Sequence, residues 1–283
     1  RDISRLPACG DDHFSFAVQG LSRYRVSTYR QRGSLSAVIR VITFELPNPD
    51  ALGIPESIIR LSDMKKGLVL VTGPAGSGKS TTLACIIDEI NRTQEKHIIT
   101  LEDPLEFLHR HKKSIVSQRE ISSDTESYLT ALRASLRQSP DVILLGEMRD
   151  FETISVAMTA AETGHLVLST LHTLGAANTI DRIIDVFPPN QQRQISVQLS
   201  SVLQAVVSQQ LIPAKDETLV PAFELMTTTP AIRNMIRENK IHQIDGLIYS
   251  SAGKDMLSMD NSILALYKSG KISETEAHSH ASN

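Results

Sequence analysis

A glycine-rich run followed by lysine and serine has the residue types and spacing of a phosphate-binding loop. The segment Gly73-Pro-Ala-Gly-Ser-Gly78-Lys79-Ser80 fits the pattern G-x-x-x-x-G-K-[ST]. Glycines let backbone N–H groups converge on an anion, because no Cβ blocks the approach. Lys79 would bridge the β- and γ-phosphates, and the Ser80 hydroxyl would bind Mg²⁺. We therefore predict an ATP site formed by Gly73, Pro74, Ala75, Gly76, Ser77, Gly78, Lys79, Ser80 and Thr81.

Acidic residues follow two other apolar segments. Val142–Gly146 ends at Glu147, and a strand over His97–Leu101 ends at Glu102 and Asp103. The carboxyl ends of parallel strands meet at one edge of a sheet, so these acids would face the phosphate loop. Glu147 would lie near the metal or the attacking water, and Glu102 and Asp103 would orient water or contact Mg²⁺ through water. The alternative is that Glu147 is an ordinary surface glutamate at the end of a strand, and that Glu102 and Asp103 belong to a solvated acidic turn.

Two histidines, His165 and His172, bracket a further apolar segment, Leu166–Thr170. On an extended strand they would point to opposite faces about 23 Å apart, which is too far to share one ion. Either could sense the γ-phosphate at a strand end, or be a structural histidine with satisfied hydrogen bonds.

These residues must be positioned by alternating strands and helices. Short apolar strands separated by helical segments predict an α/β fold with a parallel sheet covered on both faces. The strands we expect are Leu68–Thr72, His97–Leu101, Val142–Gly146, Leu166–Thr170 and Val207–Ile212. Residues 1–46 alternate with period two instead and predict a β-rich unit. We expect a linker over 47–57 and the ATPase unit over 58–283, helical from about 229.

The composition limits the class of protein. With 283 residues, 41% of them hydrophobic, the chain can form one large or two unequal domains with a core. No apolar run is long enough for a membrane-spanning helix. A net charge of −3 argues against a general nucleic-acid coat. Cys9 and Cys85 stand alone, so we expect no zinc site and a reducing cytosolic environment.

Four segments together resemble the ATPases of type II and type IV secretion and of type IV pili, over nearly the whole chain. They look like that family's Walker A motif, Asp box, Walker B motif and His box, at Gly73–Thr82, Thr100–Phe107, Ser139–Asp150 and Ala160–Thr173. A fifth segment, Ala231-Ile-Arg-Asn-Met-Ile-Arg-Glu238, resembles the AIRNLIRE segment of the pilus-retraction branch, with only Met235 differing.

The resemblance implies a RecA-like ATPase core behind a smaller N-terminal PAS-like α+β domain. That domain would be incomplete, since Arg1–Ala8 resembles an early strand and Asp12–Phe16 a much later one. It also implies that Glu147 is the Walker B glutamate, that Glu102 belongs to the Asp box and that His172 belongs to the His box. The family supplies arginines across a subunit interface, and the matching segment contains Arg23, Arg25, Arg30 and Arg32. A solvated, charged edge strand would explain these arginines equally simply.

We therefore expect a homohexameric motor that hydrolyses ATP to power pilus retraction, in the cytoplasm at the inner membrane, with a membrane platform protein as partner. The alternatives are a pilus-assembly or type II export ATPase, whose members commonly carry a four-cysteine zinc module, and a nucleic-acid translocase. The translocase is less favoured because aromatic residues are 4% of the chain and tryptophan is absent, which leaves few residues on which bases could stack.

Overall fold

A computed structural model describes residues 10–18, 21–42, 45–251 and 256–281. Within them, the strands are β1 Asp11–Val18, β2 Ser22–Gln31, β3 Ser34–Ile42, β4 Gly67–Thr72, β5 His97–Glu102, β6 Ile115–Glu120, β7 Val142–Leu145, β8 Leu166–Leu171, β9 Leu203–Pro213 and β10 Leu219–Thr227. The helices are α2 Glu56–Ile59, α3 Lys79–Thr93, α4 Tyr128–Ser135, α5 Phe151–Glu162, α6 Ala176–Asp185, α7 Pro189–Val202, α8 Pro230–Arg237, α9 Ile244–Ser250, α10 Met259–Lys268 and α11 Glu274–His280, with short 3-10 turns at Arg60–Asp63 and Ile241–Gln243. The expected early strand at Arg1–Ala8 lies outside the described residues.

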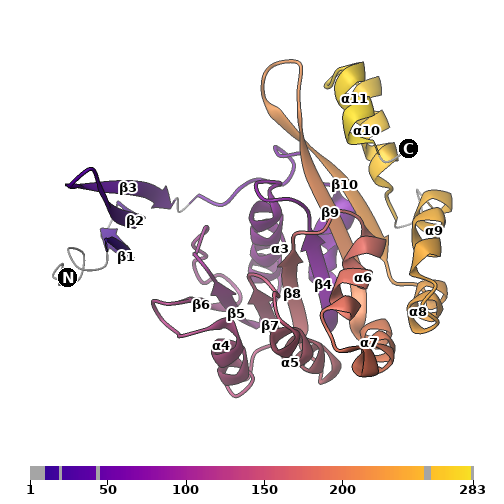
Figure 1. The fold of residues 1–283 in the computed structure, drawn as a ribbon, viewed down its shortest axis with the longest axis horizontal. Helices are drawn as coiled ribbons and strands as arrows, with labels where there is room; N and C mark the ends of the chain where they lie inside the picture. Colours follow the sequence, from indigo (N-terminus) through magenta and orange to yellow (C-terminus); the bar gives the residue numbers. More distant parts are fainter. Residues whose placement is uncertain (1–9, 19–20, 43–44, 252–255, 282–283) are drawn as a thin grey trace.

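A seven-stranded sheet forms the centre of the molecule, with the order β10-β9-β4-β8-β7-β5-β6 (Figure 1). Neighbouring strands from β9 to β6 run parallel, and β10 pairs antiparallel with β9. The predicted α/β fold is therefore confirmed, and the five expected strands are all present. The structure adds two strands that the sequence did not reveal, β6 at one edge and β10 at the other.

Both faces of the central sheet are covered, because successive residues of a strand point to opposite sides. Leu68 and Leu70 of β4 pack in a core with α4 to α9. Val69 and Val71 pack in a second core with α2 and α3. A smaller third cluster joins the ends of β9 and β10 to α10. This double covering fixes the strand ends that carry the expected site.

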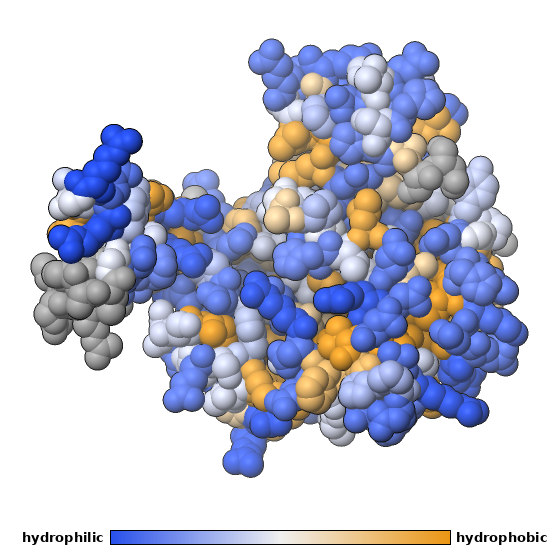
Figure 2. All heavy atoms as spheres, viewed as in Figure 1, coloured by the Kyte–Doolittle hydropathy of each residue, from blue (hydrophilic) through white to orange (hydrophobic). Residues whose placement is uncertain are grey.

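A separate antiparallel sheet of three strands, β1-β2-β3, precedes the central sheet. Figures 1 and 2 show that it projects from the main body as a distinct lobe. The period-two expectation for this region is confirmed for its described residues. Its contacts with the core include Arg23 and Ser15, both of which bind the carboxylate of Glu120 on β6.

Two N-caps begin the helices that flank the site. Ser127 Oγ accepts a hydrogen bond from Thr130 N at the start of α4, and Asp150 accepts one from Thr153 N at the start of α5. Side-chain oxygens at these positions satisfy the free N–H groups of a first helical turn. Among the described residues, no helix is both long enough and apolar enough to cross a bilayer.

Candidate functional site

The phosphate loop lies between the end of β4 and the first turn of α3, as predicted. Gly73 has a φ of 141°, and a Cβ there would lie 2.1 Å from the backbone oxygen of Gln209. Gly78 has a φ of 88°, and its Cβ would lie 2.7 Å from Gln209 Nε2. Both positions require glycine because the loop packs directly on β9. Gln209 is itself buried and accepts a hydrogen bond from Thr82 Oγ1 at 2.7 Å.

Lys79 folds back over this loop. Its Nζ donates hydrogen bonds to the carbonyl oxygens of Gly73 and Pro74, both at 2.8 Å. Burial lowers the pKa of the ammonium, and the negative charges of Glu106 and Glu147 partly offset the effect. Two acids therefore lie close enough to influence the lysine that the sequence assigns to the phosphates.

Glu147 and His172, predicted from separate motifs, lie side by side at the ends of β7 and β8. His172 Nε2 is 3.6 Å from Glu147 Oε2, which also receives a 2.7 Å ion pair from Arg149 Nε. His165, at the opposite end of β8, has its Nδ1 2.9 Å from the carbonyl oxygen of Ala160 near the end of α5. The geometry brings His172 to the acids and gives His165 a structural contact.

Glu102 is the other acid at this edge, and its pKa is raised to about 7. Burial is the main cause, and a hydrogen bond from Gln118 opposes it. A carboxyl with this pKa can hold or release a proton near neutral pH. Glu102 and Ser80 line the same cavity of about 30 Å³, and its full lining is Ser80, Leu83, Ala84, Glu102, Phe107, His109, Leu144, Gly146 and Thr170.

The pKa of Tyr128 on α4 is affected by three of the predicted acids. Burial raises the pKa of its phenol, and the charge of Glu147 adds to the increase. Asp103 and Glu102 act in the same direction. Carboxylates from the ends of β5 and β7 thus lie within electrostatic range of one hydroxyl, as the parallel topology predicts.

The four predicted N-terminal arginines lie in different places, and Arg30 and Arg32 are exposed near the end of β2 and in the turn that follows it. Arg23 forms an ion pair with Glu120. Arg25 lies opposite Arg40 in the β2–β3 register, and both line a cavity of about 210 Å³ with Glu106. Glu106 also acts on Lys79, so it links the arginine pair electrostatically to the phosphate loop. Arg40 is absent from the arginines predicted from the sequence.

A cavity of about 430 Å³ opens beside the phosphate loop at Gly78 and Thr81. Its walls are largely apolar, which suits a planar ring system better than a charged group. The apolar lining residues are Ala51, Leu52, Ile54, Leu211, Leu219, Val220, Pro221 and Leu266.

Sequence reasoning missed three polar residues that contact the site. Gln209 and Arg40 each carried a signal, since a polar residue inside an apolar strand pattern implies a specific partner. Gln118 carried none, because its strand was not recognised. All three act through contacts between residues distant in the sequence, which only the fold reveals.

Comparison with known proteins places the chain in a family. The family model described as "Type II/IV secretion system protein" matches residues 3–261. The type IV pilus retraction ATPase PilT of Pseudomonas aeruginosa is 48% identical over 268 residues, covering 95% of this chain and 78% of that protein. A twitching motility protein of Neisseria gonorrhoeae is 46% identical over 271 residues, covering 95% of this chain and 72% of that protein.

A solved structure agrees with these matches. The crystal structure of the pilus retraction motor PilT with bound ADP has a TM-score of 0.93 and 48% identity, covering 99% of this chain and 80% of that one. The parallel sheet, and the loop between β4 and α3, thus belong to a fold shared with a known pilus retraction motor that binds ADP. The chain belongs to the type II/IV secretion system protein family, and within it is an ATP-hydrolysing enzyme of the PilT type with a RecA-like core.

Proposed function

We propose that this chain is a homohexameric motor that hydrolyses ATP to power type IV pilus retraction. The observation that carries the proposal is the 48% identity, over 95% of the chain, to a protein named for that activity. The Ala231–Glu238 segment adds support, since its apolar Ile232 and Ile236 pack into the core as α8. Its polar residues remain at or near the surface.

The phosphates of ATP would lie against the backbone of residues 73–78, at the N-terminus of α3. That helix end carries a partial positive charge, which favours an anion. Lys79 would exchange its two carbonyl acceptors for phosphate oxygens and would be fully charged beside them. The largely apolar cavity at Gly78 and Thr81 would take the base.

Hydrolysis requires a carboxylate that directs water, and the site offers Glu147 and Glu102. Glu147 pairs with Arg149 at 2.7 Å and would polarise the water or its metal environment. Glu102 is partly buried with a pKa of about 7 and would accept a proton as the water attacks. His172 lies next to Glu147 and would contact the γ-phosphate when ATP is bound.

The donor set also fits Mg²⁺. The Ser80 hydroxyl and the Glu102 carboxyl line one small cavity, and oxygen donors of this kind suit a hard cation. When bound, Mg²⁺ would neutralise charge on the β- and γ-phosphates. Ser80 would hold it directly, and the carboxylates would hold its water ligands.

Arginines on the N-terminal sheet would complete the site in a hexamer. Arg25 and Arg40 share a cavity with Glu106, so they present two positive charges near the phosphate loop. Arg23 could join them after leaving Glu120. Supplying such charge from another subunit would couple hydrolysis to subunit movement and thereby to force. In this arrangement, residues 1–46 would form a partial PAS-like unit, residues 47–57 would be the linker, and residues 58–283 would form the ATPase unit.

The motor would act in the cytoplasm at the inner membrane, on a platform protein of the pilus. A pilus-assembly or type II export ATPase is the alternative within the same family. Two experiments together separate these functions. ATPase rate and particle size measured against protein concentration test the hexamer, and a monomer with a constant specific rate would refute it. Restoration of twitching in cells lacking their retraction ATPase tests the direction of work, and restored pilus assembly without retraction would favour the alternative.

A further inference from the structure

Gln118 lies in the middle of β6, next to the strand that carries Glu102. In the parallel register of β5 and β6, Thr100 is opposite Gln118 and Glu102 is opposite Glu120. Residues opposite one another on neighbouring strands point to the same face, and so do residues two apart on one strand. The side chain of Gln118 is therefore on the face that carries the Glu102 carboxyl.

Both ends of the Gln118 amide are used. Nε2 donates to Glu102 Oε1 at 3.4 Å and to the Phe107 carbonyl oxygen at 3.0 Å, while Oε1 accepts from His109 N at 2.7 Å. The amide has one chemically sensible orientation, because reversing it would place its oxygen against two acceptors. One side chain thus contacts the Glu102 carboxyl at the end of β5 and two backbone groups, at Phe107 and His109, in the segment that follows.

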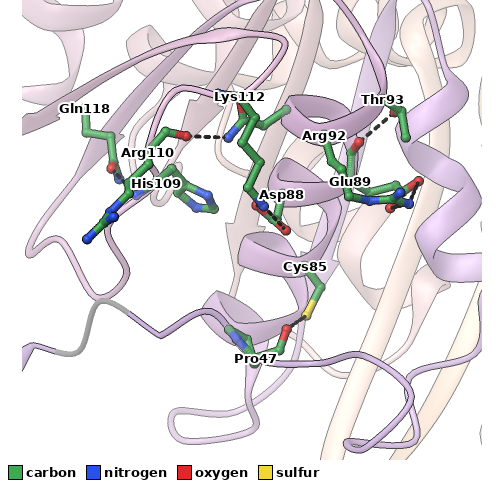
Figure 3. Close-up of polar contacts among 11 residues, drawn as sticks. Pro47, Cys85, Asp88, Glu89, Arg92, Thr93, His109, Arg110, Lys112 and Gln118 are labelled. Atoms are coloured by element: carbon green, nitrogen blue, oxygen red, sulfur yellow. Dashed lines mark hydrogen bonds and ion pairs between the residues drawn. The ribbon is translucent and has the colours of Figure 1, made fainter.

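The segment after β5, residues 103–114, is held on its other side by α3. Asn91 is fully buried; its Nδ2 donates to the Arg110 carbonyl oxygen at 2.7 Å, and its Oδ1 accepts from Lys112 N at 3.1 Å. Lys112 Nζ pairs with Asp88 at 2.6 Å, and Figure 3 shows this pair beside the helix, with Gln118 and His109 at the other side of the segment. The 103–114 segment therefore bridges the phosphate-loop helix and the catalytic strand end.

This arrangement matters because Glu102 lines the same small cavity as Ser80. A rotation of its carboxyl would change the distance to any water held there. Catalytic groups must stay within about 0.5 Å of their productive positions, which depends on neighbours that lock their side-chain conformation. An amide donor restrains a carboxylate and favours its ionised form without competing for its proton.

We propose that Gln118 is a positioning residue for ATP hydrolysis: its amide holds the Glu102 carboxyl and the Phe107–His109 backbone where Glu102 can direct the attacking water. This inference rests on the proposed catalytic role of Glu102. Gln118 touches no substrate, and its contribution passes entirely through Glu102 and the 103–114 segment.

The test is Gln118→Met, which keeps the length of the side chain and removes its hydrogen bonds. We expect kcat to fall about tenfold, the effect of losing one hydrogen bond to a charged group, with KM for ATP within about twofold of wild type. Hydrogen exchange at the His109 amide should become faster, because its acceptor is gone. Gln94→Met is the matched control, since Gln94 donates one 2.8 Å hydrogen bond to the Ser62 carbonyl oxygen, and it should leave kcat and His109 exchange unchanged.

A double-mutant cycle separates this role from a general effect on packing. In single-turnover assays on a Glu102→Gln background, Gln118→Met should cause no further loss, because the group that it positions is already disabled. A wild-type kcat in Gln118→Met, or an equal loss in both backgrounds, would overturn the proposal. Full turnover in Glu102→Gln alone would instead refute the catalytic role of Glu102. If Gln118→Met fails to fold, the isosteric Gln118→Glu replaces it in the same assays. If neither variant folds while Gln94→Met does, Gln118 has a purely structural role and the proposal is overturned.

Discussion

The two sheets of this chain hold their functional residues in different ways. In the central sheet, Leu70 and Ile99 are fully buried between layers of helices. In the N-terminal sheet, Leu35 is 60% exposed and Ile39 59% exposed in the single chain. The acids of the site extend from the first sheet, whereas the arginines extend from the second. The proposed catalytic acids are thus fixed by core packing, and the arginines are joined to the core by polar contacts such as the pair between Arg23 and Glu120.

This difference is what a motor of the proposed kind requires. A rigid sheet keeps the phosphate loop and the acids in one arrangement throughout the cycle. A weakly attached sheet can move the arginines toward or away from the phosphates. One strand serves both, because β6 carries Gln118 toward Glu102 and Glu120 toward Arg23. The following substitutions test the two regions in turn.

The largest effect should come from Lys79→Ala, at the start of α3 where the phosphate loop leaves the central sheet. Phosphoryl transfer depends almost wholly on positioning and charge, so turnover should fall by about 10³-fold or more. The rate of phosphate release from ATP is the measurement. Lys96→Ala is the control, since Lys96 makes only a 3.6 Å surface pair with Asp141. Near-normal turnover in Lys79→Ala would remove the phosphate-site assignment.

Glu147→Gln should rank second, with about 10²-fold slower hydrolysis and retained ATP binding. The amide keeps the shape of the side chain and loses the charge paired with Arg149. Binding of a fluorescent ATP analogue and turnover should be measured on one preparation, with the exposed Glu152→Gln as control. Loss of binding in a folded protein would assign Glu147 to nucleotide binding instead.

Arg25→Ala tests the other sheet, and we expect kcat to fall about tenfold with a small change in KM. The loss should be smaller than for Lys79, because Arg40 is the cross-strand partner of Arg25 and keeps one charge in place. Arg60→Ala, which removes an exposed ion pair with Glu56, is the control. If the hexamer supplies the arginines between subunits, mixed Arg25→Ala and Lys79→Ala chains should turn over ATP faster than the sum of the rates of the two chains assayed separately. No such gain in mixed hexamers would place Arg25 in the same subunit as the site.

The same contrast explains how much could be read from the sequence. Buried parallel strands are continuous apolar runs with acids at their ends, so β4, β5, β7 and β8 and the convergence of Glu147, Glu102 and Lys79 were predictable. The edge strand β6, Ile-Val-Ser-Gln-Arg-Glu, is mostly polar and has no such pattern. Glu120 on this strand contacts residues of the N-terminal sheet that are 97 and 105 positions away in the sequence. Gln118 contacts residues of the site that are 11 and 16 positions away. Such partners are chosen by tertiary packing, which a local pattern does not encode.

Glu120→Gln should loosen the junction between the sheets and reduce turnover only a few-fold. It removes the charge that binds Arg23 and weakens the bond from Ser15, contacts worth about 1 to 3 kcal/mol together. Hydrogen exchange over β1–β3 should become faster while that of β4 stays unchanged. The exposed Glu126→Gln is the matched control. Unaltered exchange in β1–β3 would show that the junction does not depend on Glu120.

The smallest effect on ATPase activity should come from α8, where the structure distinguishes two arginines that the sequence treats alike. Arg233 Nη1 donates to the carbonyl oxygens of Ser200 at 2.7 Å and Ser201 at 2.9 Å, near the end of α7. A cation at a helix C-terminus is stabilising, so Arg233→Ala should lower the free energy of unfolding by about 1 kcal/mol. Arg233 is therefore a structural residue, and a poor choice for separating catalysis from work.

Arg237 is the better probe, because it is exposed on the last turn of α8, away from Ile232 and Ile236 in the core. Its loss should leave the melting temperature and the ATPase rate within about twofold of wild type, as is usual for an exposed surface substitution. If α8 transmits work to the pilus machinery, cells whose only retraction ATPase is Arg237→Ala should nevertheless fail to twitch. Lys268→Ala, at the exposed end of α10, serves as the control that keeps twitching. Normal twitching in Arg237→Ala would remove the coupling role of this residue, while parallel loss of ATPase and twitching would make α8 part of the catalytic machinery.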